Sequence, residues 1–282
     1  MATVVTGATG RLGRLIVEGL LSRGVAATEI VATGRSVEKL ADLAARGVQV
    51  ASFDYSAVPD GVLSAGDVVV LVSGNEVGQR VAQHGSVVDA ATRAGVHRLI
   101  YTSAPAADDT TLVLAPEHAA TEQLVRDSGL TYTFLRNAWY SENYQPTFEQ
   151  AAQTGVVLAS AAQGRVASAP IVDYAEAAAA VASTSGHDNA VYELSGDVAW
   201  TFDDLAHVFS EVLGREVAYR PLTPEQHLET LLQAGLDEGT AGFVVALDQN
   251  IAEGLLGVTT GDLTKLIGRP TTPLVETVRA WG

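Results

Sequence analysis

Short apolar segments alternate with longer amphipathic segments along the first half of the chain. The apolar segments predict strands over Ala2–Val5, Glu29–Thr33, Val48–Phe53, Val68–Val72, Arg98–Thr102 and Tyr132–Leu135. The segments between them predict helices over Arg11–Arg23, Val37–Arg46, Val77–Ala94 and Pro116–Asp127. Ala57–Ala65 contains Pro59 and predicts only a poor helix. This alternation is typical of a parallel sheet with helices on both faces, so the predicted fold class is α/β, a Rossmann-type doubly wound sheet.

The pattern changes after Arg136. The segments that follow predict a polar, aromatic stretch at Asn137–Gln150, a short apolar segment at Gly155–Ala159, a loop at Ala161–Ala169, a helix over Asp173–Ser183 and a strand over Val191–Leu194. We expect this strand to rejoin the main sheet. From Thr201 the pattern is mostly helical, with helices predicted over Phe202–Leu213, Pro224–Ala234 and Thr240–Leu256 and two short ones within Leu263–Trp281. We therefore expect a cofactor-binding domain, residues 1–136, and a smaller, mostly helical substrate domain, residues 137–282, at the carboxyl ends of the strands.

Composition narrows the classes of function. The formal net charge of −16 does not favour nucleic-acid binding, which needs basic patches. The chain has no cysteine, which excludes disulfides, thiolate metal sites and a cysteine nucleophile. No apolar run approaches the ~20 residues of a membrane span, and the first predicted strand begins at Ala2, which leaves no room for a leader. We expect a cytoplasmic protein without a membrane span, either a monomer or a homodimer.

A glycine-rich turn follows the first predicted strand and opens the first predicted helix. It consists of Thr6, Gly7, Ala8, Thr9, Gly10, Arg11, Leu12 and Gly13. Backbone N–H groups in such a turn, together with the positive end of the helix, bind a pyrophosphate. The spacing is G-x-x-G-x-x-G rather than G-x-G-x-x-G, and the alternative is an ordinary turn with a helix start. The position directly after a buried-looking strand favours dinucleotide binding.

The ends of the next strands indicate which dinucleotide binds. NAD-selective folds place a carboxylate after the second strand, but this chain has Arg35 there, which suits a 2′-phosphate and predicts NADPH. Asp54 and Tyr55 follow the third strand, where an adenine amino group is read. Val72, Ser73 and Gly74 follow the fourth strand and form a small turn that can pass beneath the nicotinamide ribose. The alternatives are a solvated Arg35 and plain turns.

The usual catalytic tyrosine–lysine pair of short-chain dehydrogenases is absent. That pair needs a lysine four residues after a tyrosine, and neither Lys39 nor Lys265 stands there. The chemistry therefore requires another acid or none. Among the histidines, His118 shares a helix face with Glu122 and is a candidate proton donor; the alternative is a structural histidine. The other histidines show no metal-ligand grouping, so no metal site is expected.

The stretch after the sixth strand carries the candidate substrate groups. Trp139, Tyr140 and Tyr144 are expected to stack on a flat ring. Asn137 and Asn143 can donate hydrogen bonds to a carbonyl. Tyr140, Asn143 and His118 are the candidate catalytic residues. The alternative for the aromatic residues, Trp139 above all, is a packed cluster where two domains meet.

Several of these motifs resemble one known family. They are Thr6–Gly13, Tyr101–Ser103, Leu135–Asn137 and Leu266–Pro270, which resemble the NmrA-like branch of the atypical short-chain dehydrogenases/reductases. Further motifs resemble the bacterial type 2 NAD(P)H:quinone oxidoreductases within that branch: Ser73–Arg80, Glu117–His118, Arg136–Tyr144, Val191–Asp197 and Leu263–Thr272. In several NmrA-like proteins a lysine matches His118, and Pro105–Thr111 departs from the quinone reductase pattern, which puts the substrate mouth in doubt.

The resemblance implies a Rossmann domain, NADPH and hydride transfer to a small-molecule quinone or other carbonyl acceptor. It adds Thr102, Ser103 and Asn137 to the candidate cofactor-binding residues. A quinone accepts hydride readily because its product is aromatic, so orientation supplies much of the rate and the proton comes from water or His118. Two alternatives stay open at this point: a ketone, aldehyde or imine reductase on the same scaffold, and a non-catalytic NADP(H)-binding redox sensor.

Overall fold

A single parallel sheet organises the molecule. The computed structural model describes all residues, Met1–Gly282. The seven strands are β1 (Thr3–Val5), β2 (Ile30–Gly34), β3 (Gln49–Ser52), β4 (Val68–Leu71), β5 (Arg98–Ser103), β6 (Tyr132–Asn137) and β9 (Ala190–Leu194). Their order is β3-β2-β1-β4-β5-β6-β9, and every pairing is parallel. The predicted α/β fold class is confirmed, and the strand expected at Val191–Leu194 does rejoin the sheet beside β6.

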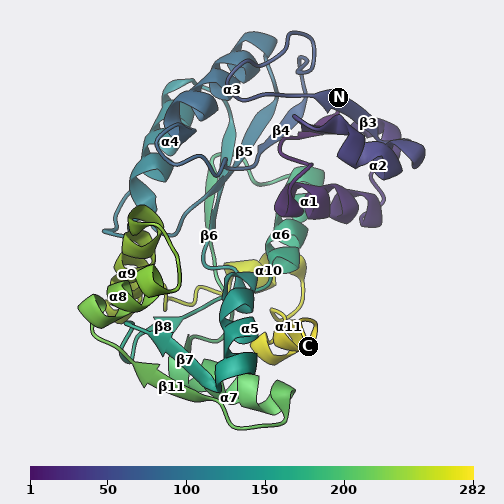
Figure 1. The fold of residues 1–282 in the computed structure, drawn as a ribbon. Coiled ribbons are helices and arrows are strands. Elements are labelled where there is room, and N and C mark those ends of the chain that lie inside the picture. Colours follow the sequence, from purple (N-terminus) through teal and green to yellow (C-terminus); the bar gives the residue numbers. More distant parts are fainter.

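Helices cover both faces of this sheet (Figure 1). Helices α1 (Arg11–Ser22) and α6 (Ile171–Ser183) lie on one face, and α3 (Arg80–Ala94) and α4 (Ala115–Asp127) lie on the other. Neighbouring strand residues supply the two layers: Val5 packs into the core beneath α1 and α6, and Val4 into the core beneath α3. This follows from the two-residue period of a strand. The predicted helix at Val37–Arg46 is instead a 3₁₀ turn, η2 (Val37–Leu40), followed by the short α2 (Ala41–Ala45).

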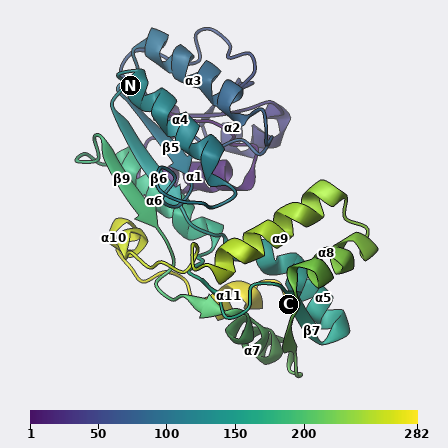
Figure 2. The same cartoon turned by 90° about the vertical axis from the view of Figure 1, so that its left-hand side faces the viewer.

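Small residues let α1 and α6 pack closely. A Cβ built on Gly19 of α1 would lie 2.9 Å from the Cβ of Ala179 in α6. The alanine-rich helix is therefore part of the sheet layer, although it comes from the second half of the chain. Helix α10 (Asp262–Ile267) packs on α6 and β9 (Figure 2).

The rest of the second half has its own apolar core below the sheet (Figures 1 and 2). Its elements are η3 (Ser141–Tyr144), α5 (Gln145–Thr154), β7 (Val156–Ala159), β8 (Arg165–Val166), β10 (Trp200–Thr201), α7 (Phe202–Leu213), β11 (Ala218–Pro221), α8 (Pro224–Gln233), α9 (Glu238–Ala252) and α11 (Leu274–Arg279). Two corrections follow. β11 lies inside the segment predicted as mostly helical and pairs with β7, and β8 lies inside the predicted loop and pairs with β10. Both strands are too short to show a periodic pattern.

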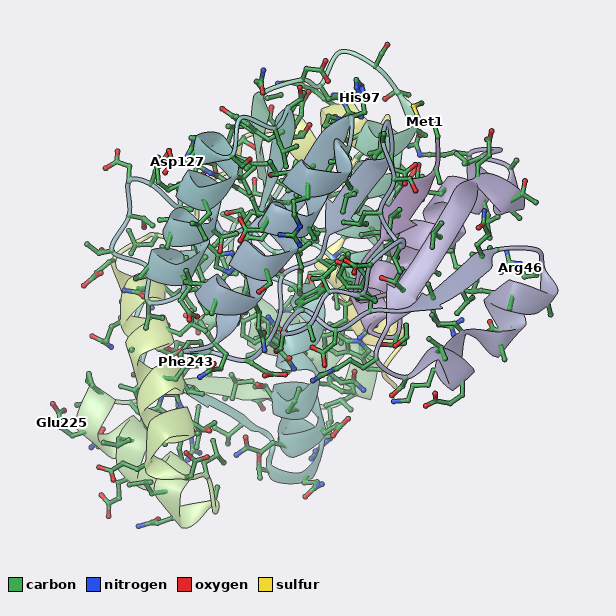
Figure 3. All side chains as sticks on the ribbon, turned by 90° about the horizontal axis from the view of Figure 1, so that it is seen from above. Met1, Arg46, His97, Asp127, Glu225 and Phe243 are labelled. Carbon is green, nitrogen blue, oxygen red and sulfur yellow. The ribbon has the colours of Figure 1, made fainter.

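The division at residue 136 stays a prediction, since α6, β9 and α10 lie on the sheet side of it. Glu225 of α8 and Phe243 of α9 mark one side of the molecule in Figure 3, and Arg46, which follows α2, marks the other. No helix combines the length and the apolar character needed to cross a membrane. The cytoplasmic location stays a prediction.

Candidate active site

The glycine turn has the geometry that the sequence predicts. Gly7 adopts a left-handed φ of +61°, which side chains disfavour, and the N–H of Gly10 donates to its carbonyl at 2.9 Å. A Cβ on Gly13 would lie 2.5 Å from the same Gly7 carbonyl oxygen. The first and third glycines are therefore required by the backbone itself, which closes a tight turn at the N-terminus of α1.

This turn forms one wall of a cleft of about 350 Å³ at the carboxyl ends of β1 to β4. The residues that line it are Gly7, Thr9, Gly10, Arg11, Leu12, Gly13, Gly34, Arg35, Phe53, Asp54, Tyr55, Val72, Ser73, Gly74, Asn75, Glu76 and Gln83. Most predicted cofactor residues are among them. The order β2-β1-β4 makes this the point where the strand order reverses, where doubly wound sheets bind nucleotides.

Five predicted cofactor residues do not line the cleft: Thr6, Ala8, Thr102, Ser103 and Asn137. Thr6 is fully buried and supports the wall from behind, because its hydroxyl accepts from the Val72 N–H at 3.0 Å and lies 2.6 Å from the Tyr55 hydroxyl. Tyr55 in turn donates to the Val72 carbonyl. Thr102 contacts a residue that lines the cleft, since its Oγ1 accepts a hydrogen bond from the Ser73 N–H. Ala8 is fully buried in the core.

The loop after β4 is held by α3 and α4. The Nε2 of His84 accepts from the Gly74 N–H at 3.0 Å, and Arg80 donates to the Gly74 carbonyl at 2.8 Å. Arg80 also pairs with Glu117 at 2.9 Å. Burial lowers the pKa of His84 to about 3, assisted by the positive charge of Arg80, so the imidazole is neutral and can accept. Through these contacts Arg80 of the motif Ser73–Arg80 and Glu117 of the motif Glu117–His118 hold the loop.

Asn137 and Tyr140 meet where β6 ends. The Asn137 amide donates to the Tyr140 hydroxyl at 3.1 Å, and its buried Oδ1 has no partner. The Tyr140 ring packs edge-on against Tyr174 of α6, with centroids 5.1 Å apart. Burial raises the pKa of Tyr140 to about 12, so its hydroxyl stays protonated and can donate.

The other residues of this stretch have different surroundings. Asn143 is exposed, and Trp139 is half-buried against the core of the second half. Tyr144 was expected to bind substrate, but it is 7% exposed and packs edge-on against Trp200 and Phe202. It packs in that core, and its role in substrate binding stays a prediction. The alternative of an aromatic cluster therefore holds for Tyr144.

His118 is buried on the inner face of α4. Its Nδ1 lies 2.8 Å from the Tyr101 hydroxyl, and burial together with Arg80 lowers its pKa to about 3. The imidazole is therefore neutral, and the imidazolium expected as a proton donor is disfavoured. Neither His118 nor Tyr101 lines the cleft.

A buried ion cluster accounts for two further motif residues. Arg136 forms two hydrogen bonds to Glu122, at 2.9 and 2.7 Å, and reaches Glu193 of β9 at 2.9 Å. Ser103 donates to the same Glu122 at 2.7 Å. The Ser103 hydroxyl is therefore engaged by Glu122, and its role in cofactor binding stays a prediction. Glu122 is fully buried, and this network ties β5, β6 and β9 to α4.

The cleft fits a dinucleotide. A Cβ added to Gly13 would collide with the Gly7 carbonyl oxygen, so the turn keeps the bare backbone that a pyrophosphate needs for close approach. The lining residues outside the predicted cofactor set are Gly34, Phe53, Gly74, Asn75, Glu76 and Gln83, of which the sequence pointed to Gly74 only as part of the turn after the fourth strand. The sequence offered one signal for Gly34, a glycine at the end of the second predicted strand. In the structure a Cβ at this position would lie 2.6 Å from the Thr9 side chain.

Comparisons with known proteins show which proteins this chain resembles. The model of the NmrA-like family matches residues 2–266. Quinone oxidoreductase 2 of Escherichia coli (strain K12) is 43% identical over 276 residues, which are 97% of this chain and 96% of that protein.

Two solved structures are similar over almost their whole length. The NADPH complex of the Escherichia coli NADPH-dependent quinone oxidoreductase QOR2 has a TM-score of 0.93 and 42% identity, with 99% of both chains covered. The Citrobacter sp. triphenylmethane reductase in complex with NADP(H) has a TM-score of 0.94 and 36% identity, with 100% of both chains covered.

Proposed function

The chain belongs to the NmrA-like family, and we propose that it is an NADPH-dependent quinone oxidoreductase. The 43% identity to the quinone oxidoreductase over nearly the full length carries this proposal. No feature of the site favours the ketone, aldehyde or imine reductase or the redox sensor. A monomeric or homodimeric state stays a prediction.

The chain's own groups bind the cofactor. The N–H groups at the start of α1 would hold the pyrophosphate, and Arg35 would hold the 2′-phosphate. Gly74 and Ser73, positioned by His84 and Thr102, support the nicotinamide ribose. When bound, NADPH supplies a hydride to the acceptor.

Tyr140 and Asn143 orient the quinone. The Tyr140 hydroxyl accepts from Asn137, which leaves its own proton free to donate to a quinone oxygen. With a pKa raised to about 12 it is a hydrogen-bond donor rather than a base. One hydride and one proton convert the quinone to a hydroquinone. Water supplies that proton, because His118 is buried and neutral.

NADPH oxidation with and without a quinone tests the proposal. We expect rapid oxidation with a benzoquinone and little with a ketone, because a ketone needs an acid to complete the reduction. A triphenylmethane dye is the informative third acceptor, given the similar Citrobacter enzyme. Tight NADPH binding without turnover of any acceptor would contradict the proposal and favour the sensor.

A further inference from the structure

An ion pair spans the adenosine end of the cleft. Arg35, which follows β2, lies 3.0 Å from Glu76, which follows β4. The second carboxylate oxygen of Glu76 accepts from Gln83 of α3 at 2.9 Å. All three side chains line the cleft. The cation expected to bind the 2′-phosphate is therefore already paired with a carboxylate that α3 holds in place.

The charged residues that line the cleft leave no excess positive charge for a 2′-phosphate. Its lining contains two arginines, Arg11 and Arg35, and two acidic residues, Asp54 and Glu76, so its formal charges cancel. Arg11 is itself paired with Glu142 at 3.2 Å. A 2′-phosphate carries close to two negative charges at neutral pH. It can contact Arg35 fully only if Glu76 moves away, or it must bind beside a like charge.

We propose that Glu76 determines cofactor specificity by competing with the 2′-phosphate for Arg35. This inference rests on the proposed function. Glu76 weakens the binding of NADPH and leaves that of NADH unaffected or improved, because a carboxylate accepts a hydrogen bond from a 2′-hydroxyl. The pair is exposed, with 67% and 43% of the two side chains accessible, so its strength is modest and solvent screens it. We expect an effect of about twofold to fivefold.

Binding of two nucleotide fragments to Glu76→Gln tests the proposal by calorimetry. Adenosine 2′,5′-bisphosphate should bind this variant about twofold to fivefold more tightly than it binds the unaltered protein, and adenosine 5′-monophosphate should bind no more tightly. The ratio of kcat/KM for NADPH over NADH should rise by the same factor. Added salt should reduce the gain.

Glu38→Gln is the matched control. Glu38 is exposed on η2, three residues after Arg35, forms no side-chain hydrogen bond and does not line the cleft. Equal gains in both variants would reveal a long-range charge effect and overturn the proposal, as would an unchanged affinity in Glu76→Gln. If the unaltered protein binds the bisphosphate and both variants bind it with the same affinity, only the role of Glu76 is refuted. If it binds neither fragment, the NADPH site and the proposed function fail as well.

Discussion

The amide of Asn137 donates a hydrogen bond to the hydroxyl of Tyr140, at 3.1 Å. The bond fixes the direction of the Tyr140 proton, which must point away from the amide. It joins the last residue of β6 to the stretch that carries the candidate substrate groups. Because Asn137 is buried and Tyr140 packs on α6, the pair is rigid before substrate binds.

Tyr140→Phe should lower kcat/KM for a quinone about fivefold to tenfold, because one hydrogen bond to the acceptor is lost. Asn143→Ala should lower it by a similar factor. Tyr144→Phe is the matched control, since the Tyr144 hydroxyl is buried without a partner and its removal costs no hydrogen bond. Steady-state kinetics measure all three. Unchanged kcat/KM in both Tyr140→Phe and Asn143→Ala would refute the assignment.

Gly13→Ala should abolish tight NADPH binding, with a rise in Kd of at least about tenfold. The added Cβ would lie 2.5 Å from the Gly7 carbonyl oxygen, so the turn must deform. Gly242→Ala is the control, because a Cβ there meets nothing within 4 Å. Fluorescence titration with NADPH measures both. Equal affinity in the two variants would mean that the turn does not hold the cofactor.

Arg136→Met should lower the free energy of unfolding by about 3 kcal/mol, since the fully buried Glu122 loses its bidentate partner and keeps only Arg126 at 3.1 Å and Ser103 at 2.7 Å. Arg136→Lys should also destabilise, because a lysine cannot form both bonds. The exposed Arg93→Met should change stability by no more than about 0.5 kcal/mol. Urea denaturation monitored by circular dichroism gives the values. A similar small change in all three would show that the buried cluster is dispensable.

Stability should fall as the pH drops from 6.5 toward 5. His84 and His118 have pKa values lowered from 6.5 to about 3, so in this window the unfolded chain takes up protons that the folded chain does not. Each histidine then lowers the free energy of unfolding by about 1.4 kcal/mol per pH unit. The contribution is fully present above pH 6.5. Denaturation of the unaltered protein and of His84→Gln between pH 6.5 and 5 tests this prediction. The free energy of unfolding should fall less steeply with decreasing pH in the variant. Equal slopes would refute the role of His84.

Much of the fold could be predicted from the sequence because it depends on local patterns. The apolar runs of β1 to β6 and the spacing of Gly7, Gly10 and Gly13 involve neighbours a few residues apart. β11 could not be predicted, because four residues that begin with Ala218 and end with Pro221 show no period, and only pairing with β7 makes them a strand.

Some features of the candidate site also follow from the sequence, and others depend on the tertiary structure. The sequence by itself determined the parallel sheet, the glycine turn and the position of Arg35 after a strand, since each follows from short-range pattern and backbone sterics. Only the tertiary structure decided that Tyr140 lies beside Asn137 while Tyr144 is buried against Trp200, and that Glu76 pairs with Arg35. The physical reason is that burial, pKa and ion pairing depend on groups distant in the chain, which only the folded sheet brings together.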